Sequence, residues 1–400
     1  MSKRTIAITV AILCICSGFT ISPVDSSNLN ISYDGNTLYV GGSGPGNYSK
    51  IQDAIDNASE EDTIFVYSGV YQEHIDVNKE INLIGEAREK TIIDGGGTGN
   101  VLIFTSSSVT MTGFTIQNSG QGAWDHGINV WDNHKDVRIS DCILTGNSGG
   151  IQFNADSDSS IKNCRIHNNS ANNIIVYLAS SNITIENCII DQNGEDGGYS
   201  GGICIDGITE QCSNIRITGC SIHHNHYDGI SISKSKNIEI DHNRIYGSTY
   251  FGMVINGVPG PLSNITIHDN TVTENGDRQF FFSAGIYLQK CLNCVTVKNN
   301  NLESNNRDGI LLRGSSGNTI SGNNIMGNAR FNAFFEGMTL PFRNYWEGNY
   351  WGRTHLLPKP ILGAKVIWLT NHTWFPIPLI NFDWHPAKSH ISNDRIMNVR

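Results

Sequence analysis

A short sequence unit recurs along most of this 400-residue chain and constrains its fold more than any other feature. In each unit two apolar residues stand two positions apart, as at Ile203/Ile205 and again at Ile230/Ile232. Because successive side chains of a strand point to opposite faces, each pair marks a strand with one apolar face. The first members of these pairs are Ile128, Ile151, Ile174, Ile203, Ile230, Met253, Ile286 and Ile310.

This periodicity predicts an all-β fold, a single-stranded parallel β-helix in which each coil stacks on the coil before it. The pairs recur every 23 to 33 residues, and no pattern of helical length intervenes between them. A second set of pairs, from Val137/Ile139 to Val295/Val297, and a third inward aliphatic residue predict three strands per coil. We expect the right-handed form, since parallel crossovers strongly prefer that hand.

One column of small or amide residues follows the second strand of each coil, and we interpret it as a structural ladder. Neighbouring residues in such a column lie about 4.8 Å apart with parallel Cβ vectors, which does not suit a disulfide. We therefore predict stacked thiols, and for Cys204, Cys212, Cys291 and Cys294 we favour a local disulfide over a zinc site. The column reads Phe114, Cys142, Cys164, Cys188, Cys220, Asn243, Asn270, Asn300 and Asn323. A second amide column runs from Asn147 to Asn328 at the next corner.

The chain divides into four predicted parts. Residues 1–24 have the charged, apolar, small-residue order of a secretory signal peptide, residues 25–46 are a polar linker, residues 47–345 form the β-helix domain, and residues 346–400 form a C-terminal cap and tail. Apolar spacing within 51–58 predicts a short helix that caps the first coil. The C-terminal part is rich in Trp and Pro. Because Pro has no backbone N–H to donate to a neighbouring strand, this part cannot continue the regular coils.

Charge and sequence motifs limit which partners and which location are expected. The formal net charge is −10, and no cluster of Lys and Arg suits nucleic acid. No further membrane span follows the signal, so we expect a secreted protein, at the extracellular surface or in the periplasm. We also expect a monomer. Seven glycosylation sequons permit a glycoprotein: Asn30, Asn47, Asn57, Asn168, Asn182, Asn264 and Asn371.

A candidate binding groove lies on the outward positions of the leading strands. Rings flanked by amides and a carboxylate suit a polysaccharide, whose sugar faces stack on aromatic rings while hydroxyl groups form hydrogen bonds. A merely solvated sheet face remains the alternative. Insertions at 194–200, 258–263 and 276–284 would form one wall of the groove. The predicted substrate-binding residues are Trp131, Asn154, Tyr177, Asp206, Tyr287 and Arg313.

A candidate catalytic ladder lies on the third strands. His167, Asp191 and His223 each follow an inward aliphatic residue, so they should stack outward on consecutive coils about 4.8 Å apart. A carboxylate between two imidazoles can serve acid and base catalysis. We expect no cofactor. A divalent metal at this ladder and a simple polar stack stay open as alternatives.

The opening stretch GPGNYSKIQDAIDNASEEDTIFVYSGVYQEHIDVNKEINLIGE, with the later TIIDGG and GFTIQNSG, resembles NosD-like and pectate-lyase-like right-handed parallel β-helix repeat proteins of secreted archaeal or bacterial type. The resemblance implies the carbohydrate-binding and sugar hydrolase group. It is weak for activity, since one scaffold carries lyases, hydrolases, epimerases and adhesins.

We therefore expect a protein that binds a polysaccharide. Whether it also modifies the polysaccharide, as a lyase, hydrolase or epimerase, stays open. Two alternatives remain open. The first is a non-catalytic cell-surface or adhesion module, since no complete catalytic motif is present. The other is a NosD-like, metal-related periplasmic protein, which the lack of a Met-rich ligand run disfavours.

Overall fold

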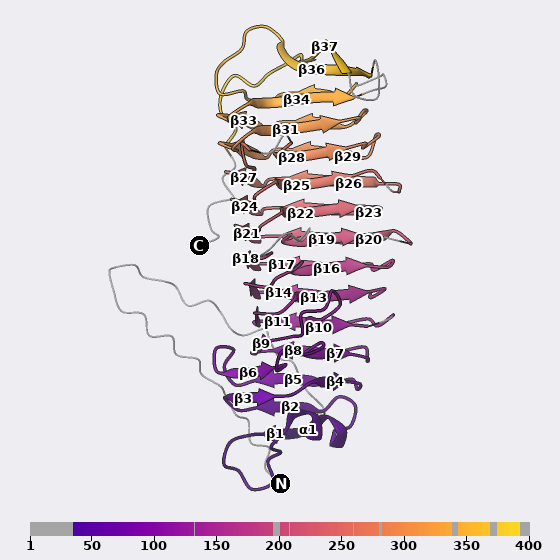
Figure 1. Cartoon of the computed structure of the whole chain (residues 1–400), viewed down its shortest axis with the longest axis vertical. Coiled ribbons are helices and arrows are strands. Elements are labelled where there is room, and N and C mark those ends of the chain that lie inside the picture. The colour runs from indigo at the N-terminus through magenta and orange to yellow at the C-terminus, as the bar shows by residue number, and fades with distance from the viewer. Residues whose placement is uncertain are drawn as a thin grey trace, which may run out of the picture. The chain divides into compact units, whose positions relative to one another are not determined.

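A computed structural model describes residues 35–131, 133–194, 201–207, 209–258, 260–279, 282–337, 343–368 and 374–392. Residues 34–400 form one compact unit. Within it, coil stacks on coil, and each regular coil contributes one strand to each of three walls (Figure 1). The predicted signal peptide at 1–24 lies outside the described residues.

The leading wall carries the first strand of each coil. Its strands pair in parallel from β4 to β36. They are β4 (Ile75–Val77), β7 (Leu102–Phe104), β10 (His126–Val130), β13 (Gly149–Asn154), β16 (Ile174–Tyr177), β19 (Ile203–Asp206), β22 (Asp228–Ser233), β25 (Phe251–Asn256), β28 (Ala284–Gln289), β31 (Asp308–Arg313), β34 (Phe331–Gly337) and β36 (Lys359–Trp368).

The second wall starts earlier in the chain and also pairs in parallel. Its strands are β1 (Thr37–Val40), β2 (Thr63–Val66), β5 (Asn82–Gly85), β8 (Thr110–Thr112), β11 (Arg138–Ser140), β14 (Ser160–Lys162), β17 (Thr184–Glu186), β20 (Cys212–Thr218), β23 (Ser235–Asp241), β26 (Ser263–His268), β29 (Val295–Lys298), β32 (Thr319–Ser321), β35 (Tyr345–Glu347) and β37 (Trp374–Asp383).

The third wall is a separate parallel sheet of short strands. They are β3 (Gly69–Gln72), β6 (Thr91–Asp94), β9 (Thr115–Gln117), β12 (Ile143–Thr145), β15 (Arg165–His167), β18 (Ile189–Asp191), β21 (Ser221–His223), β24 (Arg244–Tyr246), β27 (Thr271–Thr273), β30 (Asn301–Glu303) and β33 (Asn324–Met326). The three-strand coil predicted from the repeat is therefore confirmed.

The inward aliphatic pairs form the core, in the register that the repeat predicts. Ile203 pairs with Ile230 and Ile205 with Ile232, and all of these side chains are at most 1% exposed. Each coil alone has one thin apolar layer, so the core becomes continuous only when coils stack. Burial of these columns is what fixes the strand register.

The predicted structural ladder, which we call the corner column, forms as expected. The backbone N–H of Asn243 donates to Oδ1 of Asn270 at 2.9 Å, and Asn270 repeats this bond to Asn300 at 3.0 Å. The column continues beyond the predicted residues to Asn349 and ends on the carboxylate of Asp383. From Asn243 to Asn349, each backbone N–H of the column therefore has an amide or carboxylate oxygen as its acceptor.

All eight described cysteines are free thiols. The prediction for Cys142, Cys164, Cys188 and Cys220 holds, and each is at most 1% exposed. The disulfide expected for Cys204, Cys212, Cys291 and Cys294 is wrong. Cys212 and Cys291 instead point into the coil and donate to backbone carbonyls of the preceding coil, so they serve as small core residues.

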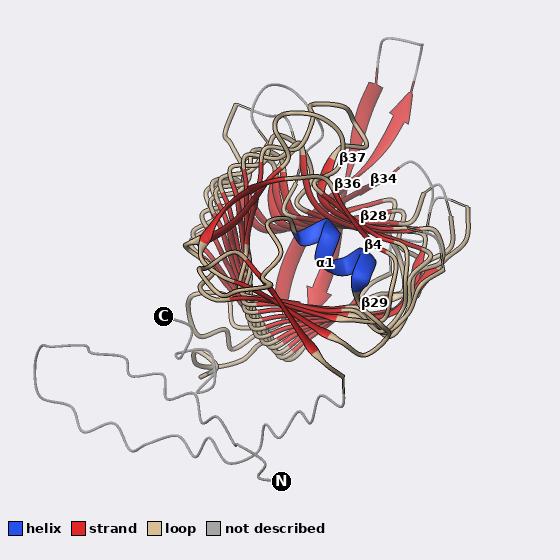
Figure 2. Cartoon of the chain, turned by 90° about the horizontal axis from the view of Figure 1, so that it is seen from below, coloured by secondary structure: helices blue, strands red, loops and turns tan. Residues whose placement is uncertain are grey.

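Both ends of the stack are capped. Helix α1 (Ile51–Asn57) lies across the open end of the first coils, with Ile51, Ala54 and Ile55 fully buried (Figure 2). Residues 37–40 belong to the predicted linker but form β1, because their backbone pairs with β2 and extends the second wall.

At the other end, β36 and β37 form an antiparallel hairpin, and Trp346 and Trp351 are buried beneath the cap with ring centroids 6.0 Å apart. The indole N–H of Trp351 donates to the buried Asp383 at 3.1 Å. Within the described ranges, no helix is long and apolar enough to cross a membrane.

Candidate functional site

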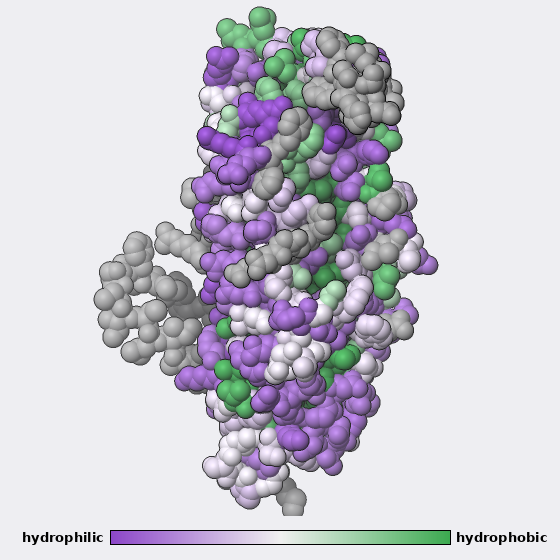
Figure 3. All heavy atoms as spheres, viewed as in Figure 1, coloured by the Kyte–Doolittle hydropathy of each residue, from purple (hydrophilic) through white to green (hydrophobic). Residues whose placement is uncertain are grey.

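The predicted groove residues stack on the outer face of the leading wall in the expected register. Asn154, Tyr177, Asp206 and Ser233 pair successively, as do Gln289 and Arg313 further along. A parallel sheet repeats about every 4.8 Å, so a chain lying along the stack meets one of these side chains per coil. Figure 3 shows hydrophobic residues along the middle of this face, bordered by hydrophilic ones.

Burial divides these residues into two sets. Trp131 is 54% exposed and Arg313 is exposed, while Tyr177 and Asp206 are half-buried. Asn154 is only 6% exposed, and its amide bonds to Gln152 and Asn129. The set within reach of a ligand is therefore Trp131, Tyr177, Asp206 and Arg313.

Tyr287 belongs to a small outer apolar cluster rather than to the accessible set. It is 5% exposed, and its ring stacks on that of Phe251 with centroids 4.7 Å apart. Phe282 packs against this cluster and lies over the guanidinium of Arg313 at 4.4 Å. The predicted wall insertion thus covers part of the face through Phe282, while its Phe280 and Phe281, like residues 195–200, lie outside the described residues.

Asp228 is not among the site residues that the sequence predicts, but the structure makes it a candidate. It starts β22, pairs in register with Phe251, and is 5% exposed. Its Oδ1 has no hydrogen-bond partner. Burial raises the pKa of this carboxyl to about 8, against a lowering hydrogen bond from the Phe251 backbone, so it holds a proton at neutral pH.

The predicted catalytic ladder also has the expected register. His167 pairs with Asp191, Asp191 with His223, and His223 with Tyr246. The partner of Asp191, however, is Arg165, whose guanidinium nitrogens lie 3.2 and 3.4 Å from the two carboxylate oxygens. Because Arg165 sits two residues before His167 on the same face of β15, its position could have been read from the sequence.

The two imidazoles are held in their neutral forms. Burial lowers the pKa of each below its ordinary value, and the charge of Arg165, joined for His223 by that of Arg244, acts in the same direction, although Asp191 partly opposes this. The ring of His223 stacks on Tyr246 at 4.6 Å, and its Nδ1 lies 3.0 Å from Nδ1 of His224. Nδ1 of His167 is buried and has no partner.

The two predicted halves of the site lie on different walls. The groove residues face outward from the leading wall, and the ladder residues belong to the third wall. One sugar cannot contact both sets at once, so the ladder and the groove do not form a single active site. A cavity of about 320 Å³ opens at the corner after the ladder, and His224 and His226 are among the residues that line it.

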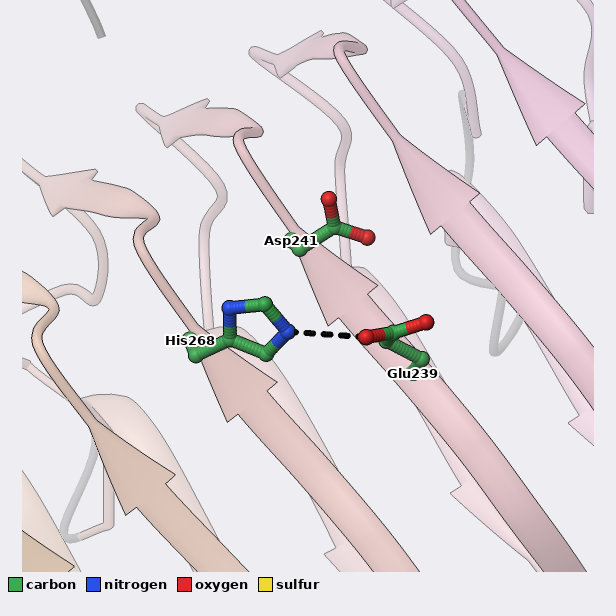
Figure 4. A group of neighbouring side chains, drawn as sticks. All are labelled: Glu239, Asp241 and His268. Atoms are coloured by element: carbon green, nitrogen blue, oxygen red, sulfur yellow. Dashed lines mark hydrogen bonds and ion pairs between the residues drawn. The ribbon is translucent and has the colours of Figure 1, made fainter. Parts of the chain in front are cut away.

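A third polar group lies on the second wall. Glu239 and Asp241 on β23 and His268 on β26 bring potential ligand atoms within 4.8 Å of one another, as no other three such residues do in the described part of the chain (Figure 4). Asp241 and His268 pair in register, which the aligned stretches NIEID and NITIH would have predicted.

This third group is an ion-pair network. The guanidinium of Arg216 lies 2.8 and 2.9 Å from the oxygens of the fully buried Asp241, and His242 and Thr218 also bond to it. Burial alone would raise the pKa of Asp241, but these bonds bring it below its usual range. The same bonds occupy the oxygens of Asp241 that a metal would need, so the group fits a structural role better than a metal centre.

A family model for the right handed beta helix region matches residues 75–207 and 199–325. The chain belongs to this family. None of the curated proteins matches it significantly.

Solved structures are similar in fold. The mannuronan C-5 epimerase AlgE4 A-module of Azotobacter vinelandii aligns with a TM-score of 0.58 and 17% identity over 75% of this chain and 89% of that one. The Agl-KA catalytic domain gives 0.58 and 17% over 71% and 60%. A mannuronic acid specific family 6 lyase from human gut microbiota gives 0.55 and 15% over 74% and 82%. At these identities the likeness concerns the fold alone.

Proposed function

We propose that this protein binds a polysaccharide along the outer face of its leading wall. The observation that carries the proposal is the pairing of Tyr177 with Asp206 on adjacent coils of the leading wall, with Trp131 directly after β10 and Arg313 at the end of β31 on the same wall. An exposed indole can stack on a sugar ring, and the carboxylate and guanidinium can bond its hydroxyl groups. The names of the structural neighbours, an epimerase of mannuronan and a polysaccharide lyase, support the same class of ligand.

Binding is tested with a glycan array and titration of the best ligand. Trp131→Ala should weaken binding about tenfold, the factor that roughly 1.4 kcal/mol of lost stacking represents. Trp384→Ala is the matched control, since this Trp is 62% exposed but lies in the C-terminal cap. Failure of the native protein to bind any acidic or neutral glycan would refute the proposal.

A catalytic version of this function is the second candidate, and Asp228 is the observation that favours it. A carboxylic acid that stays protonated at neutral pH on the same face can donate a proton to a leaving oxygen. If the bound glycan is also converted, Asp228→Asn should abolish product formation while affinity changes less than twofold. Retained turnover in that variant would exclude Asp228 as the proton donor, and absence of any product with the native protein would leave a binding or adhesion module as the function.

A further inference from the structure

A cavity of about 310 Å³ lies where the last regular coil meets the C-terminal cap. β34 and β36 are neighbouring parallel strands (Figure 1), but their described pairs join only residues 335–337 with 363–365. Residues 331–333 and 359–362 precede this ladder and line the cavity instead. Backbone donors and acceptors on this edge of β34 are therefore open to a ligand.

The lining of this cavity includes both buried and exposed residues. Trp351 and Ile361 are 5% and 2% exposed, whereas Arg330, Pro360 and Leu362 are exposed. A small molecule can therefore enter from solvent. The volume is at the lower end of the range for small-molecule sites, so the cavity suits one sugar-sized ring rather than a long chain.

Lys359 brings a cation to this cavity without a counter-charge. Its side chain shares a face of β36 with the buried Ile361, and its Nζ lies 6.0 Å from the ring centroid of Trp351. Among the described residues, Lys359 takes part in no ion pair. Burial, together with the charge of Arg353, lowers its pKa below the ordinary value, as expected for a cation that lacks an anionic partner.

A second cation, Arg330, also lines the cavity and is held in place. Its Nη1 lies 3.4 Å from Oδ2 of the fully buried Asp308, and its guanidinium lies over the rings of Phe331 and Phe334 at 4.9 and 5.2 Å. Burial raises the pKa of Asp308 to about 6, so this carboxyl is ionised at neutral pH. Asp308 thus balances the charge of Arg330, and that of Lys359 stays unbalanced.

Asn332 adds an amide donor to the same lining. Its Oδ1 accepts from the backbone N–H and from Nδ2 of Asn328, at 3.3 and 3.2 Å, which leaves its own Nδ2 to donate to a ligand. Phe331 and Leu362 give the cavity an apolar side. A fitting ligand has one anionic group, several hydroxyl groups and a face of C–H bonds.

We propose that this cavity binds one sugar residue that carries a carboxylate, a uronate. The carboxylate pairs with Lys359, the hydroxyl groups bond to Asn332 and to the open backbone edge of β34, and the C–H face packs on Phe331. An inorganic anion is a poorer occupant, because it leaves the amide and the apolar side unused. A peptide strand is also poorer, because only three residues of the edge are open.

The experiment titrates the full chain with the methyl glycosides of glucuronate, galacturonate and mannuronate, with those of glucose, galactose and mannose, and with phosphate. NMR of the indole N–H signals follows binding, because Trp351 lies beside Lys359. We expect at least one uronate to bind with a Kd of about 1 mM, and at least about tenfold more tightly than its neutral counterpart or phosphate. The shifts should saturate at Trp351.

Three variants test the assigned contacts. Lys359→Met keeps the length of the side chain without its charge and should weaken uronate binding about tenfold. Asn332→Asp keeps the oxygen that Asn328 uses but replaces the donor with a like charge, so it should lose at least as much. Lys298→Met is the matched control, because it removes the charge of an exposed Lys at the end of β29 on the second wall. It should leave uronate affinity unchanged.

The proposal does not rest on polysaccharide binding along the leading wall, and the two can fail separately. Trp131→Ala should leave uronate binding intact, and Lys359→Met should leave intact any glycan binding that depends on Trp131. Only variants that keep the native thermal midpoint are compared. Four results would each overturn the proposal: no saturable binding of any of the three uronates, equal affinity for a uronate and its neutral counterpart, equal affinity for phosphate, or full uronate affinity in Lys359→Met.

Discussion

Two buried polar regions of this molecule satisfy their polar atoms in opposite ways. In the corner column, Asn270 accepts from the backbone and side chain of Asn243 and donates to Ile240, His268 and Asn300. On the leading wall and the turn after it, Asp228 and Asp156 are 5% and 0% exposed, yet Oδ1 of Asp228 and both oxygens of Asp156 lack a partner.

The difference separates structure from candidate function. A stacked amide offers both a donor and an acceptor, so an amide column continues from coil to coil without leaving a buried polar atom unpaired. A carboxylate offers only acceptors when ionised, so burial with too few donors favours its protonated form. The corner column therefore stabilises the fold, whereas the two aspartates destabilise it at neutral pH. Stability does not explain their presence, and a function would.

The largest expected effect is a dependence of stability on pH. Burial raises the pKa of Asp156 to about 7 and that of Asp228 to about 8. Their protonated forms are favoured in the folded state, so the stability they contribute is complete below pH ~4 and is lost as pH rises toward 8. Each should lower the free energy of unfolding by about 1.4 kcal/mol per pH unit within its window. Urea denaturation at pH 5, 6.5 and 8 measures this.

Asp228→Asn is the control for that prediction. The amide keeps the shape but does not ionise, so the variant should lose about half of the slope between pH 5 and 7 and most of it between pH 7 and 8, and be more stable than the native chain at pH 8. Carboxylates whose pKa is lowered, such as Asp241, act below pH ~4 and do not confound the window. The test is read above pH 6.5, because the lowered pKa values of His126, His167 and His223 give an opposite slope below it. A native profile that is flat from pH 6.5 to 8 would contradict the prediction.

The second effect is the cost of breaking the corner column. Asn270→Ala leaves the backbone N–H of Asn243 unpaired in the core, along with two carbonyls, and should cost about 3 kcal/mol in the free energy of unfolding. The control is Asn237→Gly, in an exposed run of amides that bond side chain to side chain. Because Gly accepts its φ of 54°, this change should cost a few tenths of a kcal/mol. If both variants lost the same free energy of unfolding, burial would not be what makes an amide column stabilising.

The repeat predicts much of this arrangement, because inward aliphatic residues with a period of two define where each strand lies. Ile203 and Ile230, and His167 and Asp191, pair as the aligned units imply. The sequence does not predict burial of the outward positions. Tyr287 is covered by Phe251 and by residues of an irregular insertion, and such cover depends on contacts between coils of different length. For the same reason the isolation of Asp228 became visible only in three dimensions.

The smallest effect concerns the first half of the corner column, where thiols replace amides. The backbone N–H of Cys188 reaches only the sulfur of Cys220, at 3.4 Å, while Cys220 itself donates to Asn243 at 2.8 Å. An Asn in place of Cys220 would extend the amide stack by one coil, with its amide near the carbonyls of Ile185 and Thr218 that the thiol now approaches.

We therefore expect Cys220→Asn to change the free energy of unfolding by less than about 1 kcal/mol, whereas Cys220→Ala should cost roughly 1 kcal/mol or more. Chemical denaturation of both variants measures the difference. Hydrogen exchange of the Cys188 amide gives the local readout, because a true oxygen acceptor should slow its exchange. If Cys220→Asn proved as costly as Cys220→Ala, the core beside the thiols would be too tightly packed for an amide, and the switch from Cys to Asn along the column would reflect side-chain volume rather than hydrogen bonding.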